Sequence, residues 1–378
     1  MGTQCKIWAD DSLAGNTAAQ QQFLGLSRSC YRGQASCYAP RDEDVLAAVD
    51  RDCFAGRQRA FMALPGGNCV ARVVARISPV LEGPERTPLG MLGFFEALDR
   101  PNEVVEMLHA ALAWTREQGA RQVVGPMDGD TWHRYRLNVG PHDEPPFLGE
   151  PVNPTYYPHL WEEAGFEPIE RYYSKRLDDV SVVLPRFEPI LRRVASNGYR
   201  LRPMNLQRFD DELRILFDLS RAAFRENFLY DEIGWDDFRK LYAATRPLLD
   251  ADLVTLAQAP NGQYVGFLFA YADLYHAVNA MRGHRGLLAK LRFWWNRRKA
   301  NAVNLKSLGV LPGYRRSGVG TALVCQAYQR LLAHGFRRAN LCLIRDGNPS
   351  GRLDGGHGRI LRRYVLYGYR CGTGNSGE

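Results

Sequence analysis

Apolar and polar positions follow the same succession of periods in the two halves of the chain. In the C-terminal half, two runs with strand-like patterning flank the turn Pro260-Asn261-Gly262 and predict a β-hairpin. Farther along, apolar residues from 323 to 331 recur at helical spacing. The predicted elements are a strand at 199–203, a helix at 213–228, hairpin strands at 253–259 and 264–271, a strand at 304–311, a helix at 319–334, and strands at 339–344 and 359–369.

The N-terminal half repeats this order. Its predicted elements are hairpin strands at 60–64 and 69–77, a strand at 89–96, a helix at 103–118, a strand at 122–124 and a helix at 158–164. Such internal similarity predicts a tandem architecture of the α/β (α+β) class. We expect two copies of one fold, residues 1–180 and residues 181–378, each a mixed, mostly antiparallel sheet flanked by helices.

The stretch between the 304–311 strand and the next helix is the most informative motif, and it reads Arg315-x-x-Gly318-x-Gly320. Two glycines let the backbone approach a ligand closely, and the N–H groups of a helix N-terminus suit a phosphate or pyrophosphate. No Gly-Lys-Ser/Thr follows, which excludes a Walker loop, and the third glycine of the dinucleotide fingerprint is missing. The equivalent stretch of the first half, residues 97–102, has no glycine and adds Asp99, so it should not hold a pyrophosphate.

The pattern Val310-x-Pro312-x-x-Arg315-Arg316-x-Gly318-x-Gly320, followed by a helix, a strand and Asn348, resembles the acyl-CoA motif of the GNAT superfamily of N-acetyltransferases. The chain is similar to bacterial tandem-domain members of this superfamily of the same length. In architecture it also resembles mycothiol synthase-type acetyltransferases and tRNA-dependent aminoacyltransferases of cell-wall synthesis. Further residues carry the resemblance: Gly93-Phe94-Phe95-Glu96, Gly125-Pro126-Met127, Asn153-Pro154-x-Tyr156-Tyr157, Gly165-Phe166, Asp346-Gly347-Asn348, Gly355-Gly356, Arg363-Tyr364 and Tyr367.

The resemblance implies two tandem acyltransferase folds, the second competent and the first degenerate. It also implies an N-acyltransferase that moves an acetyl or other acyl group from acyl-CoA to the amine of a small or amino-acid-like acceptor. Direct attack in a ternary complex would make the amide. An aminoacyl-tRNA donor, an acyl-carrier-protein donor and a non-catalytic CoA-binding module remain alternatives. The implied CoA site consists of Val310, Leu311, Arg315, Arg316, Ser317, Gly318, Val319, Gly320, Thr321 and Asn348.

The catalytic residues are less well defined by the sequence. Many superfamily members protonate the departing thiolate with a helical Tyr shortly before a Gly-Phe pair, and Tyr364 superficially fits. Only nine residues follow Tyr369, so we expect the helix after Asn348 to be shortened and Tyr364 to lie on the last strand. The acid is therefore left open, with Tyr364 and Tyr367 as candidates. Asp273 and His276 are candidate bases, together with Glu226, Asp231 and Glu232.

Candidate acceptor-binding residues come mainly from a long loop between Met127 and Pro158. Its aromatic and polar residues predict either a pocket wall against the second half or an irregular lid. The candidate acceptor residues are Glu96, Trp132, Glu150, Tyr156 and Glu226.

Charge is distributed unevenly. The net charge is +8, yet residues 274–345 contain no Asp or Glu and 14 Lys or Arg. A positive surface suits the phosphates of CoA or an acidic carrier protein, and it would also attract tRNA. Within it, residues 282–299 place leucines and tryptophans at helical spacing among basic residues. We expect a helix that covers the body with its apolar stripe; a membrane-surface or tRNA-facing helix is the alternative.

Composition favours a globular, cytoplasmic protein, and the resemblance implies a bacterial one. Hydrophobic residues make up 45% and charged residues 24% of the chain. No apolar run reaches the length of a membrane span, and no signal-peptide core is present. The eight cysteines include no Cys-x-x-Cys pair, and no histidine spacing is typical of a metal site, so we expect reduced thiols and no metal.

Overall fold

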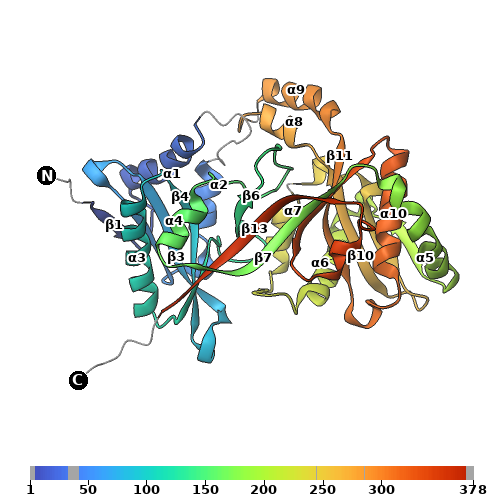
Figure 1. Cartoon of the computed structure of the whole chain (residues 1–378), viewed down its shortest axis with the longest axis horizontal. Coiled ribbons are helices and arrows are strands. Elements are labelled where there is room, and N and C mark those ends of the chain that lie inside the picture. Colours follow the sequence, from blue (N-terminus) through green and yellow to red (C-terminus); the bar gives the residue numbers. More distant parts are fainter. Residues whose placement is uncertain (1–4, 33–41, 244, 285, 372–378) are drawn as a thin grey trace.

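The computed structural model describes residues 5–32, 42–243, 245–284 and 286–371. In this part of the chain, one sheet of 13 strands runs through both halves in the order β1-β2-β3-β4-β5-β13-β7-β12-β11-β10-β9-β8, with β6 paired to β13 (Figure 1). The strands are β1 Ile7–Asp10, β2 Gln58–Ala63, β3 Ala71–Glu82, β4 Pro88–Ala97, β5 Gln122–Gly125, β6 Leu137–Gly140, β7 Glu167–Leu177, β8 Arg200–Pro203, β9 Val254–Gln258, β10 Tyr264–Ala272, β11 Ala302–Val310, β12 Arg338–Arg345 and β13 Arg359–Arg370.

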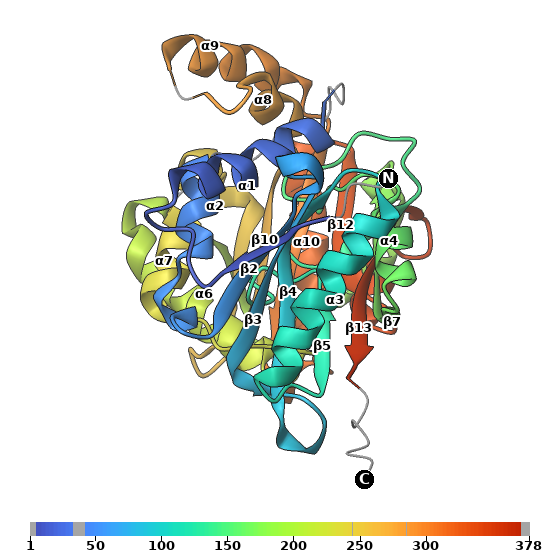
Figure 2. The ribbon, with the colours of Figure 1, turned by 90° about the vertical axis from the view of Figure 1, so that its left-hand side faces the viewer.

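Helices cover both faces of the sheet in each half. In the N-terminal half, α3 and α4 pack on one face, and α1 and α2 pack on the other (Figure 2). In the C-terminal half, α5 and α10 share one core with the sheet, while α6 and α7 form a second core on the opposite face. The helices are α1 Thr17–Cys30, α2 Asp42–Val49, α3 Pro101–Glu117, α4 Tyr157–Glu163, α5 Leu184–Ser196, α6 Phe209–Phe224, α7 Trp235–Ala243, α8 Tyr275–Ala280, α9 Leu287–Asn296 and α10 Val319–Ala333.

The two halves exchange strands at the centre of the sheet. Strand β7 belongs to the first half of the chain but pairs with β12, and the C-terminal strand β13 pairs with β5 of the first half (Figure 1). The two exchanged strands also pair with each other along most of their length. This explains why few residues follow Tyr369: β7 supplies one strand of the second unit from the first half. The division at residue 180 remains a prediction, and the sheet is continuous across it.

The mixed α/β class with a largely antiparallel sheet is confirmed, as are the strands and helices predicted from periodicity. The helix after Asn348 is indeed shortened, to a 3-10 turn at Pro349–Arg352, and Tyr364 lies on β13. The sequence analysis missed β7, whose charged and polar residues hide its strand pattern, and α5, which contains Pro185 and Pro189.

The segment 282–299 corrects one expectation. Helix α9 forms, but its leucines and tryptophans face solvent rather than the body, so the predicted cover helix is wrong. Figures 1 and 2 show α8 and α9 projecting from one side of the molecule. Among the helices of the described residues, none is both long enough and apolar enough to cross a membrane.

Candidate active site

Strands β11 and β12 separate part way along their length. They pair in parallel only between residues 302–305 and 338–341, although β11 continues to Val310 and β12 to Arg345. The pairing of β11 with β10, on its other side, is irregular at the same point. On β11, Ser307 pairs with Phe269 and Leu305 with Ala270, so Lys306 is left without a partner as a β-bulge. The divergence leaves a wedge between two central strands, which is where a ligand can reach the backbone of β11.

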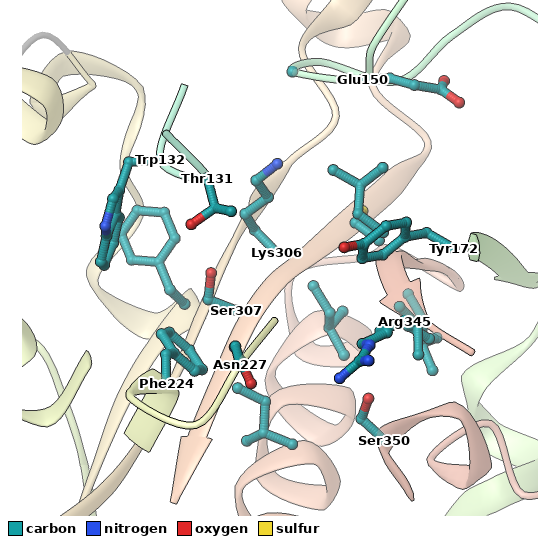
Figure 3. Close-up of a pocket in the computed structure, with 18 of the residues that line it drawn as sticks. Thr131, Trp132, Glu150, Tyr172, Phe224, Asn227, Lys306, Ser307, Arg345 and Ser350 are labelled. Atoms are coloured by element: carbon teal, nitrogen blue, oxygen red, sulfur yellow. The ribbon is translucent and has the colours of Figure 1, made fainter. Parts of the chain in front are cut away.

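A cavity of about 810 Å3 occupies this region. Its walls come from both halves: residues 131–136 and 148–151 of the first half face α6, α7, β10, β11 and β12 of the second (Figure 3). The cavity therefore forms only where the two halves meet. This is where the aromatic loop after Met127 was predicted to build one side of a pocket.

One part of the cavity is apolar. It lies against α6, α7 and β10, and hydrocarbon and aromatic groups dominate its lining. Such a lobe accommodates a hydrocarbon chain better than a polar ligand. Its lining residues are Phe224, Phe228, Leu241, Tyr242, Leu248, Leu249, Leu268 and Phe269.

Lys306 is the most unusual residue of the cavity. Figure 3 shows its side chain directed into the open space near Thr131 and Ser307. Among the described residues, its ammonium group has neither a hydrogen-bond nor an ion-pair partner. Burial, the largest cause, lowers the pKa of Lys306 to about 8, and the positive charge of Arg136 acts in the same direction. The group is therefore close to the point at which it can exchange a proton near neutral pH.

Arg136 lines the same cavity. Its guanidinium is stacked between the rings of Tyr135 and Tyr172, with its carbon 3.8 and 4.0 Å from their centroids. The residue is 6% exposed, and its Nε and Nη1 atoms have no hydrogen-bond partner among the described residues. Two cationic side chains thus lie in one cavity. In the described part of the chain, neither of them forms an ion pair with a carboxylate.

The glycine-rich loop has the geometry that a pyrophosphate requires. Gly318 is the N-cap of α10 and has φ of +89°, a conformation that favours glycine. A Cβ atom there would lie 3.1 Å from Ile190 and 3.3 Å from Arg193, both on α5. Arg315 forms an ion pair with Glu226 at 2.9 Å across the mouth of the loop.

Several amides at this helix end have no acceptor in the described structure. The N–H groups of Arg316, Gly318, Gly320 and Thr321 make no hydrogen bond to a protein group in the residues described. They lie at the positive end of the α10 dipole, which together with the free donors favours an anion. The residues present therefore fit the pyrophosphate of an acyl-CoA.

The edge of β11 provides further free donors. The Leu311 amide donates to Val265 on the β10 side at 2.9 Å. Because backbone groups alternate along a strand, the amides of Val310 and Leu308 point to the opposite edge, toward the wedge. These two amides are therefore available to a ligand that enters the wedge.

The equivalent wedge of the first half is filled by the chain itself. Strands β4 and β5 pair only at residues 89–91 with 122–124, and the following segment folds back against β4. The Met127 amide donates to Leu92 at 2.8 Å, and the Asp128 carboxylate accepts from the Phe94 amide at 2.6 Å. A Cβ atom on Gly93 would overlap the Met127 carbonyl oxygen. The space that a donor would need is therefore occupied.

The predicted catalytic residues lie outside the lining of the cavity. Tyr364 is fully buried, donates a hydrogen bond to Glu150 and lies 3.1 Å from the Ser174 hydroxyl. Asp273 accepts from the Leu148 amide at 2.9 Å, and burial raises its pKa. His276 is exposed. Their catalytic roles stay predictions that this geometry does not favour.

The acceptor candidates divide into two groups. Trp132 and Glu150 line the cavity, and the Trp132 indole donates to the Asp231 carbonyl at 2.9 Å. Glu96, Tyr156 and Glu226 do not line it. Glu96 is buried and accepts from Tyr157 at 2.7 Å, the Tyr156 hydroxyl donates to Ala97 at 2.8 Å, and Glu226 is the partner of Arg315.

Glu150 also has a structural partner. Its carboxylate lies 2.7 Å from Nε of Arg362, which is 2% exposed and donates to the carbonyls of Pro141 and Glu144. The buried pair of Glu150 and Arg362 thus links the loop after β6 to strand β13. Burial raises the pKa of Glu150 against the lowering effect of Arg362.

Sequence reasoning did not select Lys306. The signal that could have found it is a lysine, two residues before Leu308, in the middle of a strand that has no other charged residue. The expectation of no metal remains a prediction. Asp250, Asp252 and His334 offer ligand atoms within 4.8 Å of one another, and none of the three lines the cavity.

Part of the chain matches a known protein family, and most of it is similar to a curated bacterial protein. Residues 220–353 match the acetyltransferase (GNAT) family. A bacterial ceramide synthase from Caulobacter vibrioides is 24% identical over 299 residues, which cover 77% of each chain.

Two solved structures share the fold. One is a tandem GNAT protein of the clavulanic acid biosynthesis pathway, with a TM-score of 0.50 and 12% identity over 98% of this chain and 100% of that one. The other contains a GCN5-related glucosamine N-acetyltransferase region of a fungal multi-domain β-N-acetylglucosaminidase. It has a TM-score of 0.54 and 14% identity over 97% of this chain, which spans only 38% of the larger protein.

Proposed function

We propose that this chain, whose residues 220–353 match the acetyltransferase (GNAT) family, is an acyl-CoA-dependent N-acyltransferase whose acceptor amine carries a hydrocarbon chain. One observation carries the proposal. The wedge between β11 and β12 leads from the unpaired amides at the start of α10 to a cavity that contains Lys306 and ends in an apolar lobe.

The second half alone would hold the donor. The amides of residues 316–321 would bind the pyrophosphate, and Arg193 and Arg316 lie on or beside the same loop. An acyl-CoA supplies the activated acyl group, with its thiol as leaving group. The first half, whose wedge is filled by residues 125–128, would serve as a wall of the acceptor site.

Lys306 would accept the proton of the acceptor amine. An amine attacks a thioester carbonyl only in its neutral form, and the products are an amide and a free thiol. The amides of Leu308 and Val310 face the wedge, where they would hold the carbonyl oxygen. Neutral Lys306 would take the proton that the nitrogen loses as its bond to the acyl carbon forms. The acyl carbon–sulfur bond then breaks, and the proton held by Lys306 would pass, directly or through water, to the departing thiolate, which gives the free thiol and restores neutral Lys306.

The apolar lobe supports an acceptor with a hydrocarbon chain. The cavity-lining residues between 224 and 271 include no charged side chain, and most of them are apolar or aromatic; Asn227 and Thr245 are polar. The similar protein from Caulobacter is called a ceramide synthase, and ceramide is an amide of a long-chain amine. A long-chain amino alcohol is therefore a better model acceptor than a sugar amine.

The experiment measures free thiol and amide product with a series of acyl-CoA donors. A long-chain 2-amino alcohol should be acylated with a kcat/KM at least tenfold above that of ethanolamine. Leu249→Asp, which puts a charge into the lobe, should remove this preference. Equal rates with the two amines would contradict the assignment of the lobe, and no amide from any amine would contradict the function.

The donor site has a matched pair of variants. Gly318→Asp should abolish acyl-CoA binding, because the side chain needs a strained backbone and adds negative charge beside the pyrophosphate. Gly313→Asp adds the same charge in the same loop, where a Cβ meets nothing within 4 Å, and it should bind nearly normally. Equal affinity of the two variants would place the pyrophosphate elsewhere.

A further inference from the structure

Helix α9 presents an apolar face to solvent. Eight large hydrophobic residues of the described chain are exposed, and five of them lie on this one helix. The exposed fractions are 78% for Leu287, 70% for Leu288, 61% for Leu291, 58% for Trp294 and 77% for Trp295. A cluster of this kind on an otherwise ordinary surface marks an interaction site.

The apolar face has a defined shape. At 100° per residue, the five side chains fall within an arc about 120° wide on the helix surface. Lys290 and Arg292 lie on its two flanks, and the buried Ala289 lies on the opposite side, toward α8. Helix α9 thus packs toward α8 through Ala289, while its large hydrophobic side chains point away from α8.

The charged residues on α9 and in the segments that flank it in sequence are all basic. Arg282, Lys290, Arg292 and residues 297–299 are exposed, and no ion pair involves any of them in the described structure. No acidic residue occurs from 274 to 345. The Arg297 guanidinium lies 4.2 Å from the Trp294 ring centroid, so a cation and an aromatic ring lie next to each other. Leucine, tryptophan and basic residues in this arrangement are typical of helices that lie in a membrane interface.

We propose that α9 docks this protein on the surface of an anionic lipid bilayer. Leu287, Leu288, Leu291, Trp294 and Trp295 would enter the boundary between headgroups and acyl chains, and the flanking cations would contact lipid phosphates. The proposal does not depend on the reaction catalysed. It has a structural consequence, because the base of the α8–α9 projection is tied to the cavity wall by the hydrogen bond from the Leu148 amide to Asp273. A docked molecule would hold that wall next to the lipid surface.

The test uses the full chain and vesicles of phosphatidylcholine with or without phosphatidylglycerol. Co-flotation should show binding to the anionic vesicles, weaker binding to the neutral ones, and loss of binding as salt is raised. Tryptophan emission should shift to the blue on binding. Trp294→Ser/Trp295→Ser should lower vesicle affinity at least tenfold, because it removes the two largest inserting groups.

Matched controls separate docking from general surface effects. Val182→Ser changes an apolar residue that is 48% exposed elsewhere and should bind vesicles like the wild type. Arg297→Gln/Arg298→Gln/Lys299→Gln should lose affinity for anionic vesicles, whereas Arg208→Gln/Arg214→Gln/Arg239→Gln, with the same loss of charge, should retain it. Thiol release with a water-soluble amine should be unchanged in all of them.

Four results would overturn the proposal. The wild type could fail to bind anionic vesicles at low salt, or the tryptophan variant could bind them as the wild type does. Size-exclusion chromatography could show a dimer that the tryptophan variant dissociates, in which case a second copy covers α9. Binding of tRNA that competes with the vesicles and survives the tryptophan substitution would assign the surface to nucleic acid instead.

Discussion

Lys306 shows how a single position can carry chemistry that its residue type alone does not reveal. Its place in a bulge directs the side chain into a cavity, and burial lowers its pKa from 10.5 to about 8. Because the neutral form accepts the proton, kcat should rise with pH up to about 8 and level off above it. A rate–pH profile of the wild type measures this directly.

Lys306→Met should lower kcat by roughly 10²-fold or more and flatten the profile. The same variant should be more stable at pH 7, because the folded wild type holds a charge in a poorly hydrated site. The sign of the linkage is fixed: from about pH 8 to 10.5 the unfolded chain binds more protons at Lys306, so its contribution makes stability rise with pH. A pH-dependent rise in kcat that persists in Lys306→Met would show that another group is the base.

Tyr364 is the contrasting case. Its hydroxyl donates to Glu150 inside the sheet, and burial raises its pKa. Tyr364→Phe should therefore keep near-normal kcat and lose about 1.5–3 kcal/mol of stability, the range for a hydrogen bond to a charged group. Denaturant unfolding and steady-state kinetics test this together. A drop in kcat of roughly 10²-fold at unchanged melting temperature would make Tyr364 the catalytic acid.

At the scale of elements, the exchange of β7 and β13 decides how the molecule holds together. Strand β13 lies between β5 of one half and β7, which itself continues to β12 of the other half. Val365 on β13 is 3% exposed and belongs to the core of the first half. A destabilising substitution in β13 should therefore lower the stability of both halves, since neither has a complete sheet without this strand.

Val365→Asp should lower the free energy of unfolding by several kcal/mol, because it buries an unpaired charge. Hydrogen exchange should accelerate in both β5 and β12, and unfolding should remain one transition. Arg363→Gln, at an exposed position of the same strand, is the control and should change stability little. Faster exchange confined to β5 would show that the halves fold independently.

At the scale of the whole molecule, the two halves have the same order of elements but unequal clefts. In the part of the chain that the structure describes, only the second half has unpaired amides at a glycine-capped helix, and the wedge of the first is filled by its own backbone. Acyl-CoA should consequently bind with one-to-one stoichiometry. Titration calorimetry tests this, and two equivalent sites, or none, would contradict a tandem pair with one competent half.

What the sequence by itself determined is local. Periodicity located the hairpins, the central helices and most strands, and the spacing Arg315-x-x-Gly318-x-Gly320 indicated a strand, a turn and a helix N-terminus that suits an anion. These features depend on neighbours within a few turns, so a short window of sequence contains the physical information that produces them.

The tertiary structure decided everything that depends on distant partners. Which strands lie beside β7 and β13 follows from pairing across nearly 200 residues, which no local pattern encodes. The wedge exists because β11 and β12 stop pairing, and Lys306 enters it only through the bulge against β10. For α9, periodicity identified an amphipathic helix, but only packing determines whether its apolar face meets the body or solvent.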